Sequence, residues 1–378
     1  MENKDFDKLC EEVSNQEFLN VEEPKKMEEE PVKKEKPKKK KVWKKVLIVF
    51  ASLFVLGIGT GLFLLYGPWS WFRETLITTA MTTMNHQYLA TWFYDDETIQ
   101  KVLNNHAVIE SGEQTDTTQI VISDVPSNVT VYESIYEEQI LKKDEGNDLY
   151  KIVPITEAKF KGYLVVIYDP SKVKIANSSS LGKSGQLITK IAADNNAVIA
   201  INASGFEDPN WNSNGARPHG MIIKDGKLVW NNTRAQVGGG LVGFTNDNIL
   251  ILGKMTPQEA LNKGVRDGME FGPYLIVNGK PSFIKGNGGW GIAPRTAIGQ
   301  RKDGIVLFLI IDGRTTASVG ADMVDLTEIM QRYKAYNAAN MDGGSSTALI
   351  VKNQIYNKPV AAGKNGLRAI PNAWIVVE

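Results

Sequence analysis

The stretch Asn340-Met341-Asp342-Gly343-Gly344-Ser345-Ser346-Thr347 combines one carboxylate with two serine hydroxyls on a backbone that contains two adjacent glycines. Glycine accepts positive φ and allows close backbone approach, so these side chains can converge on one small polar ligand. Apolar residues at helical spacing predict a helix over residues 322–336, and the apolar run at 348–351 predicts a strand. The glycines would then lie at a helix-to-strand turn, and a simple glycine stop of the helix is the alternative reading.

Four other polar clusters lie where predicted strands begin or end, at residues 202–206, 217–220, 293–297 and 312–314. Rigid strands can aim such side chains at one shared pocket. Arginine offers a fork for an oxyanion, which suits a sugar or phosphate ligand. Each cluster also has a purely structural explanation: His219 alone fits a core histidine better, and Asp312-Gly313 is a common turn. The shared position of all five clusters favours a binding site.

Short strand-like runs dominate the chain after about residue 158. They cover residues 163–168, 197–201, 221–223, 228–230, 241–244, 249–252, 274–277, 295–299, 305–311, 348–351 and 373–377. Helical patterns interrupt them only at residues 186–195, 257–263 and 322–336. Many strands with few helices, not strictly alternating, predict an α+β fold with mixed β-sheets.

The region before this domain has a different composition. Lysine and arginine together number 43, equal to aspartate plus glutamate, yet seven of the ten residues from Lys36 to Lys45 are lysine. An uncharged apolar run follows from Val46 to Tyr66, long enough at 1.5 Å per residue to cross roughly 30 Å of hydrocarbon. The lysines therefore indicate a transmembrane helix with its N-terminus in the cytoplasm, with membrane lipid and not nucleic acid as the partner. A cleaved signal peptide fits less well because the apolar run is too long.

These patterns divide the 378 residues into four parts. A tail rich in Glu, Lys and Pro at residues 1–45 is expected to be disordered, and it contains the only cysteine, Cys10. The transmembrane helix spans 46–66, and a juxtamembrane amphipathic helix at about 71–105 plus a linker fill 67–157. The folded domain covers 158–378. An exterior domain of this size without cysteine favours a bacterial surface protein.

The five polar clusters, with residues 368–372 before the last strand, resemble the motif series of the phosphodiester glycosidase family, to which N-acetylglucosamine-1-phosphodiester α-N-acetylglucosaminidases belong. The resemblance covers about residues 158–378, and the Asp342-Gly343-Gly344 cluster is its most diagnostic part. Residues 202–206 read Asn-Ala-Ser-Gly-Phe, where the family more often has Gly-Gly before Phe.

The resemblance implies hydrolysis of the bond between the anomeric carbon of a sugar and a phosphate that also esterifies a second group. Phosphate is already a good leaving group, so handling of charge should matter more than strong acid assistance. Asp342 would face the anomeric carbon, Arg295 would hold the phosphate, and Asp312 would orient Arg295 or share the acid and base roles. The substrate-binding residues would be Asn202, Phe206, His219, Gly343, Gly344, Ser345, Ser346 and Arg368.

Two other functions compete with this one. The same pocket could hold phosphorylated wall or capsule glycans without cleaving them. A metal-dependent phosphodiesterase using Asp312 and Asp342 fits less well, because histidines are few and the carboxylates lack tight ligand spacing. No cofactor and no metal site is therefore expected, and binding of a divalent cation such as calcium is kept as the alternative. The expected substrate is an extracellular carbohydrate phosphodiester.

Overall fold

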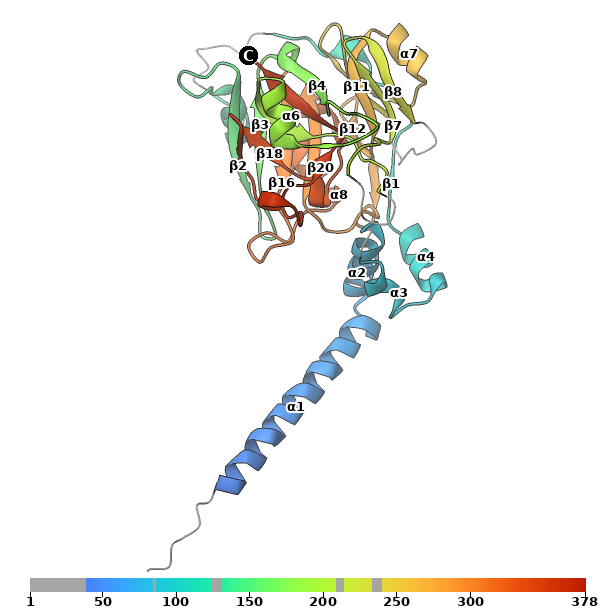
Figure 1. Cartoon of the computed structure of the whole chain (residues 1–378), viewed down its shortest axis with the longest axis vertical. Helices are drawn as coiled ribbons and strands as arrows, with labels where there is room; N and C mark the ends of the chain where they lie inside the picture. The colour runs from blue at the N-terminus through green and yellow to red at the C-terminus, as the bar shows by residue number, and fades with distance from the viewer. Residues whose placement is uncertain (1–38, 84–85, 124–130, 209–213, 233–239) are drawn as a thin grey trace, which may run out of the picture. The chain divides into compact units, whose positions relative to one another are not determined.

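The computed structural model describes residues 39–83, 86–123, 131–208, 214–232 and 240–378 (Figure 1). Cys10 and most of the tail expected to be disordered lie outside these residues. The chain divides into two compact units, residues 1–60 and residues 61–378. The described residues form an α+β protein, as the sequence predicted, in which every sheet is built from antiparallel pairs.

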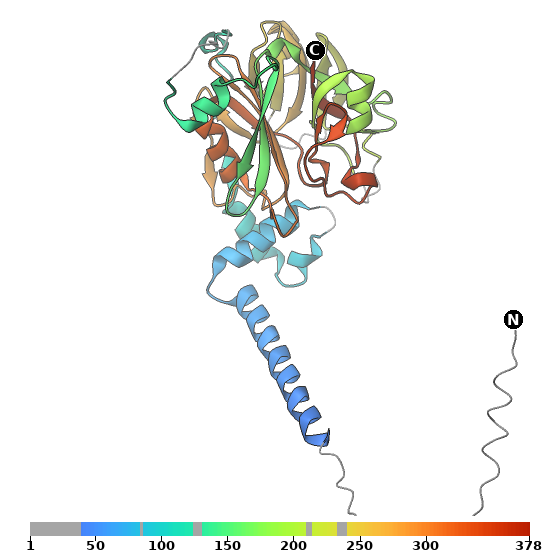
Figure 2. The same cartoon turned by 90° about the vertical axis from the view of Figure 1, so that its left-hand side faces the viewer.

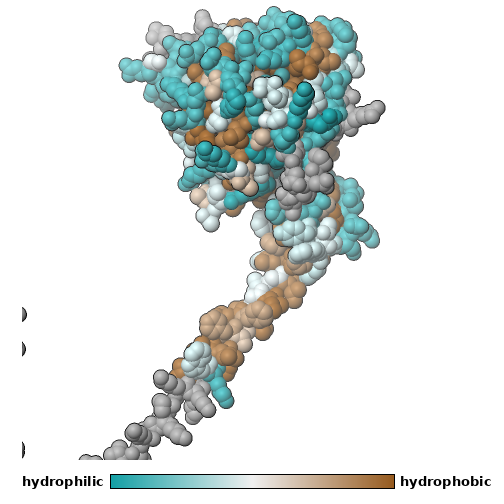
Figure 3. Space-filling view, viewed as in Figure 1, coloured by the Kyte–Doolittle hydropathy of each residue, from teal (hydrophilic) through white to brown (hydrophobic). Residues whose placement is uncertain are grey.

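Helix α1, Lys39–Tyr66, begins inside the predicted tail and contains the apolar run. Residues Val42–Tyr66 have the length and composition of a membrane span, features that a signal sequence near the N-terminus shares. Its large side chains are open to solvent, with Leu47 69% and Phe54 70% exposed. Figure 3 shows this surface in brown, the colour of hydrophobic residues.

Three short helices, and not the single one predicted for residues 71–105, follow this run. They are α2 (Ser70–Thr82), α3 (Tyr88–Thr91) and α4 (Asp96–Asn104). The Asp95 side chain starts α4 by accepting a hydrogen bond of 2.7 Å from the Thr98 N–H. Ile77, Ala90 and Ile99 pack in a small core that the three helices share. The predicted single helix is therefore divided into separate helices, the last of which begins at the Asp95 cap.

The central sheet has seven strands in the order β13-β12-β17-β15-β16-β3-β2. Their bounds are Lys280–Pro281, Tyr274–Val277, Ala335–Asn340, Arg295–Arg301, Val306–Ile311, Lys161–Ile167 and Tyr150–Thr156. Strand β2 already begins before the predicted domain boundary at residue 158. The buried run Val306–Ile311 is sandwiched between β15 and β3, as its continuous apolar sequence requires.

Two five-stranded sheets pack beside it. The first has the order β10-β9-β11-β7-β8, with bounds Leu250–Gly253, Gly240–Thr245, Val265–Phe271, Gly220–Lys224 and Lys227–Asn232. The second has the order β19-β18-β6-β21-β4, with bounds Gln354–Ile355, Leu349–Val351, Ala197–Asn202, Asn372–Val377 and Val173–Asn177. Two-stranded ladders join β1 (Ala107–Ile109) to β14 (Phe283–Lys285), and β5 (Gln186–Leu187) to β20 (Ala369–Ile370).

All three large sheets contribute to one hydrophobic core. Phe308 of β16, Phe244 of β9 and Trp374 of β21 are fully buried in it. Helices α5 (Ile135–Leu141) and α8 (Met323–Arg332) cover the other face of the central sheet. Helix α6 (Ile188–Asp194) packs on the sheet of β6 and β21, and Figure 2 shows the green helix beside red strands from the C-terminal part of this sheet. Helix α7 (Pro257–Asn262) packs on the sheet of β9.

Strand β17 replaces the last turn of the helix predicted for residues 322–336. Helix α8 ends at Arg332, and Ala335–Asn340 is a fully buried strand between β12 and β15. Its sequence, Ala-Tyr-Asn-Ala-Ala-Asn, has weak strand propensity, so long-range sheet pairing overrides the local preference. The diagnostic glycines therefore follow a strand and not a helix.

Candidate functional site

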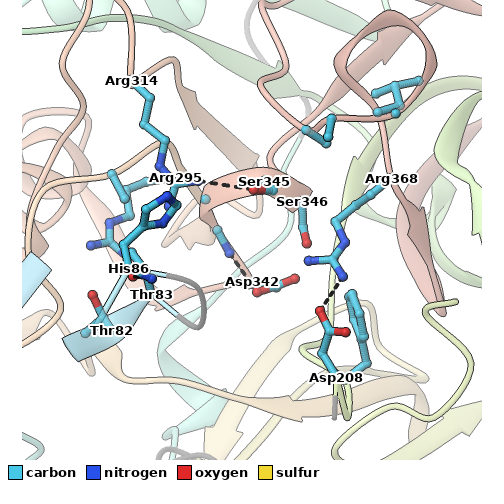
Figure 4. A pocket seen from close by; sticks show the side chains of 18 of the residues that line it. Thr82, Thr83, His86, Asp208, Arg295, Arg314, Asp342, Ser345, Ser346 and Arg368 are labelled. Carbon is cyan, nitrogen blue, oxygen red and sulfur yellow. Dashed lines mark hydrogen bonds and ion pairs between the residues drawn. The ribbon is translucent and has the colours of Figure 1, made fainter. Parts of the chain in front are cut away.

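A pocket of about 570 Å³ lies beside the loop that follows β17 (Figure 4). Its walls come from loops after β6 and β17, the loops around β15 and β16, the loop before β20, and helix α2. The charged and polar side chains that line it are Thr79, Thr82, Thr83, His86, Asp208, Arg295, Arg314, Asp342, Ser345, Ser346, Lys364 and Arg368. Segments far apart in the sequence thus meet at one cavity.

Backbone hydrogen bonds fix the Asp342 loop to neighbouring strands. The Met341 N–H donates to the Thr296 carbonyl at 2.8 Å, and the Asp342 N–H donates to the Ala203 carbonyl at 3.0 Å. A Cβ at Gly343 would lie 2.9 Å from the Pro294 carbonyl oxygen, and Gly344 has φ +60°. Both positions therefore require glycine, and the chain can then turn tightly beneath the pocket.

Asp342 lies on the pocket floor, where one of its carboxylate oxygens accepts a hydrogen bond of 3.0 Å from the Gly343 N–H. Burial raises the pKa of Asp342 to about 6, although a hydrogen bond from Ser346 and the charge of Arg368 act in the opposite direction. A carboxyl group with this pKa changes its ionisation close to neutral pH. Such a group can serve in proton transfer or charge stabilisation.

Two arginines of different character lie on one side of the floor. The guanidinium of Arg295, only 4% exposed, donates to the backbone carbonyls of Ala321 (3.1 Å), Trp290 (2.5 Å) and Gly291 (2.6 Å). Burial lowers the pKa of Arg295 to about 10, and the like charge of Arg314 contributes to this shift. Arg295 is therefore held mainly by the protein backbone.

Arg314 is an exposed residue with φ +57°, and its guanidinium donates to the Ser345 hydroxyl at 3.1 Å. Desolvation lowers the pKa of Arg314. Within the described residues no carboxylate forms an ion pair with it. Its positive charge is thus available to an anion in the pocket.

On the opposite side of the pocket lies a third arginine, Arg368, whose charge is neutralised by a carboxylate. Arg368 pairs with Asp208 at 2.5 Å, and its guanidinium lies 4.6 Å from the centre of the Phe206 ring. The charge of Asp208 also raises the pKa of Asp342. Figure 4 shows Arg368 and Asp208 on one side of Asp342, with Arg295, Arg314 and His86 on the other.

This fold and pocket belong to a domain with known relatives. Residues 195–377 match the family model described as phosphodiester glycosidase. These residues belong to the phosphodiester glycosidase family. The glycosidase domain includes all five polar clusters, and helices α1 to α4 lie outside the matched residues.

Two individual proteins are similar to this chain. An uncharacterized protein derived from the SPbeta prophage of Bacillus subtilis is 30% identical over 218 residues, which make up 55% of this chain. The chain spans only 33% of that relative's length. A solved structure with a similar fold is the catalytic domain of zebrafish N-acetylglucosamine-1-phosphodiester alpha-N-acetylglucosaminidase, auto-inhibited by its pro-peptide. Its superposition has a TM-score of 0.51 and 21% sequence identity, and it covers 62% of this chain and 86% of the zebrafish domain. That likeness shows a shared fold.

Most of the residues predicted for the site meet in the glycosidase domain's pocket. Asp342, Arg295, Phe206, Gly343, Gly344, Ser345, Ser346 and Arg368 all line it. Three others do not. His219 lies elsewhere, and burial lowers its pKa. Asp312 accepts hydrogen bonds from the Asn357 side chain (3.0 Å) and the Lys358 N–H (2.9 Å), so it holds a neighbouring segment.

Asn202 supports the site from below. Its side-chain amide donates to the Asp342 carbonyl at 2.6 Å, and its oxygen accepts from the Thr296 hydroxyl at 2.8 Å and the Ala348 N–H at 3.2 Å. These bonds link β6, β15 and the loop after β17. Asn202 therefore positions the Asp342 loop of the glycosidase domain.

Sequence reasoning missed Lys364 and two further charged groups of this pocket. Arg314 stood inside a recognised cluster but was not assigned to the site, and Asp208 follows Phe206 by two positions. Proximity to a motif could have indicated both. The residues that α2 contributes gave no such signal, because an apolar stripe predicts only packing.

Proposed function

We propose that this protein hydrolyses the bond between the anomeric carbon of a sugar and the phosphate of a phosphodiester. The observation that carries this proposal is the arrangement around Asp342: a carboxyl group with a pKa of about 6 lies between Arg314, which has no carboxylate partner among the described residues, and Arg368, which is neutralised by Asp208. The first arginine suits a phosphate, and the carboxylate suits the carbon that becomes cationic. The products are a free sugar and a phosphate monoester.

Arg314 takes the phosphate in this proposal, in place of the role that the sequence suggested for Arg295. A guanidinium donates two parallel hydrogen bonds to phosphate oxygens, and the buried charge of Arg295 nearby strengthens the local positive potential. Arg295 thereby acts through charge and through the loop it supports. Ser345 and Ser346 supply hydroxyls at the boundary between sugar and phosphate.

Asp342 acts as a carboxylate at neutral pH. It stabilises positive charge on the sugar ring or accepts a proton from the attacking water. Strong acid assistance is unnecessary, because the departing phosphate monoester is a stable anion. Asp208 is a second carboxyl group on the sugar side, where it forms an ion pair with Arg368.

The location of this activity follows from helix α1. We infer that Val42–Tyr66 anchors the chain in a membrane, with the lysine-rich side in the cytoplasm and the glycosidase domain outside. A cell-surface or extracellular polysaccharide with phosphodiester links is then the accessible substrate. Protease added to intact cells should degrade a C-terminal tag, and protection of that tag would contradict this orientation.

The hydrolysis is tested with the full-length chain in detergent and a panel of sugar-1-phosphodiesters. We expect release of free sugar and a phosphate monoester by the native chain but not by the Asp342→Asn variant. Tight binding of the panel without any product would instead indicate a glycan-binding module. A parallel reaction with chelator reports whether a bound cation contributes.

A further inference from the structure

Helix α2 is fastened to the loop that supports Arg295. The Ile292 N–H donates to the Thr79 hydroxyl at 3.1 Å, and the Asn287 side-chain amide donates to the Thr78 hydroxyl at 2.7 Å. Gly291 has φ +58°, and a Cβ there would lie 2.4 Å from the Thr79 Cα. The loop can approach the helix this closely only because this position is glycine.

The same loop contacts Arg295 from its other side. The carbonyls of Trp290 and Gly291 accept hydrogen bonds from the Arg295 guanidinium, and the Trp290 carbonyl also accepts one from the Thr82 hydroxyl at 3.2 Å. Helix α2, the loop and Arg295 therefore form one connected structure. The helix is built into the site although it lies outside the residues matched by the family model.

The C-terminal end of α2, together with Thr83 and His86, forms a wall of the pocket. Thr79, Thr82, Thr83 and His86 line the same cavity as Arg314, and a second cavity of about 240 Å³ continues between α2, His86 and Arg314. The Thr83 hydroxyl accepts a hydrogen bond of 3.1 Å from the His86 N–H, which links His86 to the residue that directly follows α2. Figure 4 shows His86, Thr82 and Thr83 on the side of Arg295 and Arg314, away from Arg368.

We propose that this wall is the subsite for the second group esterified to the phosphate, and that it selects a hydroxyl-bearing group such as a polyol or a sugar. This inference rests on the proposed function, since the phosphate at Arg314 directs the second group toward α2. The wall presents three hydroxyls and one imidazole to the main pocket. The Thr82 and Thr83 hydroxyls already donate to backbone carbonyls, so they can accept hydrogen bonds from substrate hydroxyls, and the imidazole can also exchange hydrogen bonds with them. His86 is the specificity-determining residue, because its ring donates and accepts without an ion-pair partner of opposite charge among the described residues.

The test compares two substrates with the same sugar that differ only in the second group, glycerol in one and methyl in the other. In the full-length chain, His86→Ala should lower kcat/KM for the glycerol diester by about three- to tenfold, the worth of one or two hydrogen bonds. The methyl diester should change by less than about twofold. His86→Gln should restore part of the loss, and the control Thr91→Ala on the exposed side of α3 should leave both rates unchanged.

Equal losses on both substrates, or no loss on either, would overturn the subsite. A gain on both would also overturn it, because α2 would then obstruct the pocket. If the native chain cleaves neither substrate, calorimetric binding of the two diesters to the native chain and to His86→Ala replaces the rates. Selective weakening of glycerol diester binding would then support the subsite while the proposed hydrolysis fails, and absence of binding would overturn both.

Discussion

The ionised form of Asp342 lowers the stability of the folded chain, although it is the form that the proposed reaction needs. Its carboxyl group loses its proton near the ordinary pKa in the unfolded chain but only near pH 6 in the folded one. Between these values the folded state binds more protons, so the free energy of unfolding falls as pH rises, and above pH 6 the full cost is present. In the proposed mechanism this partly buried charge is the form of Asp342 that the reaction uses.

Replacement of Asp342 by asparagine should therefore have opposite effects on the two properties. At pH 8 the variant should unfold in urea with a free energy higher by about 1–2 kcal/mol, given 1.36 kcal/mol per pKa unit and partial solvent screening. Hydrolysis should fall by about 100-fold or more. Unchanged hydrolysis in a folded variant would remove Asp342 from the mechanism.

The dependence of kcat/KM on pH should report the ionisation of Asp342. With Asp342 active as the carboxylate, kcat/KM should rise about tenfold per pH unit below pH 6 and then level off. Rates measured between pH 4 and pH 8 on one sugar-1-phosphodiester test this. A rate that declines as pH rises through 6 would instead mean that the protonated acid is the active form.

Replacement of Arg314 should weaken the use of phosphodiester substrates, whereas replacement of Arg295 should mainly lower the stability of the fold. Arg314→Ala should lower kcat/KM about 10- to 100-fold on phosphodiesters, the worth of charge-assisted hydrogen bonds, with little loss on a neutral aryl glycoside. Arg295→Ala removes three guanidinium hydrogen bonds to backbone carbonyls and should lower the free energy of unfolding by about 2 kcal/mol or more. Equal losses on both substrates for Arg314→Ala would contradict its phosphate role.

At the scale of elements, Asp312 links strand β16 to the segment that leads into the pocket-lining loop at 361–369. Asp312→Ala should lower the free energy of unfolding by about 1–3 kcal/mol, because the Asn357 and Lys358 donors lose their acceptor. The kcat of the folded fraction should stay within about threefold of the native value. A kcat loss comparable to that of Asp342→Asn would restore the catalytic role that the sequence suggested for Asp312.

The strands that the sequence predicted are those with strong local signals. Tyr274–Val277 matches its prediction at both ends, and the turn at 224–226 joins β7 to β8 as expected. The predicted helix at 322–336 ran two residues into Ala335–Asn340, and no strand was predicted there, because this alanine-rich sequence has weak strand propensity and forms a strand only through sheet pairing. Local patterns carry no information about such pairing.

The residues of the candidate site likewise include some that local sequence signals predicted and others that they did not. Clusters at strand ends identified Asp342 and its neighbours, because strand ends converge on one edge of a fold. Which side chain of a cluster faces the cavity depends on contacts between distant segments, as with Asn202 beneath the Asp342 loop. For the same reason His86, distant in sequence from every cluster, could not be assigned from local pattern.

At the scale of the whole molecule, the central claim is that the glycosidase domain breaks the bond between the anomeric carbon and its oxygen and leaves the phosphorus–oxygen bonds intact. Hydrolysis of a sugar-1-phosphodiester by the full-length chain in water enriched in ¹⁸O tests this directly. Our account predicts a phosphate monoester product without ¹⁸O, because water adds to the sugar. A phosphate product that carries ¹⁸O would mean attack at phosphorus, and would contradict the account.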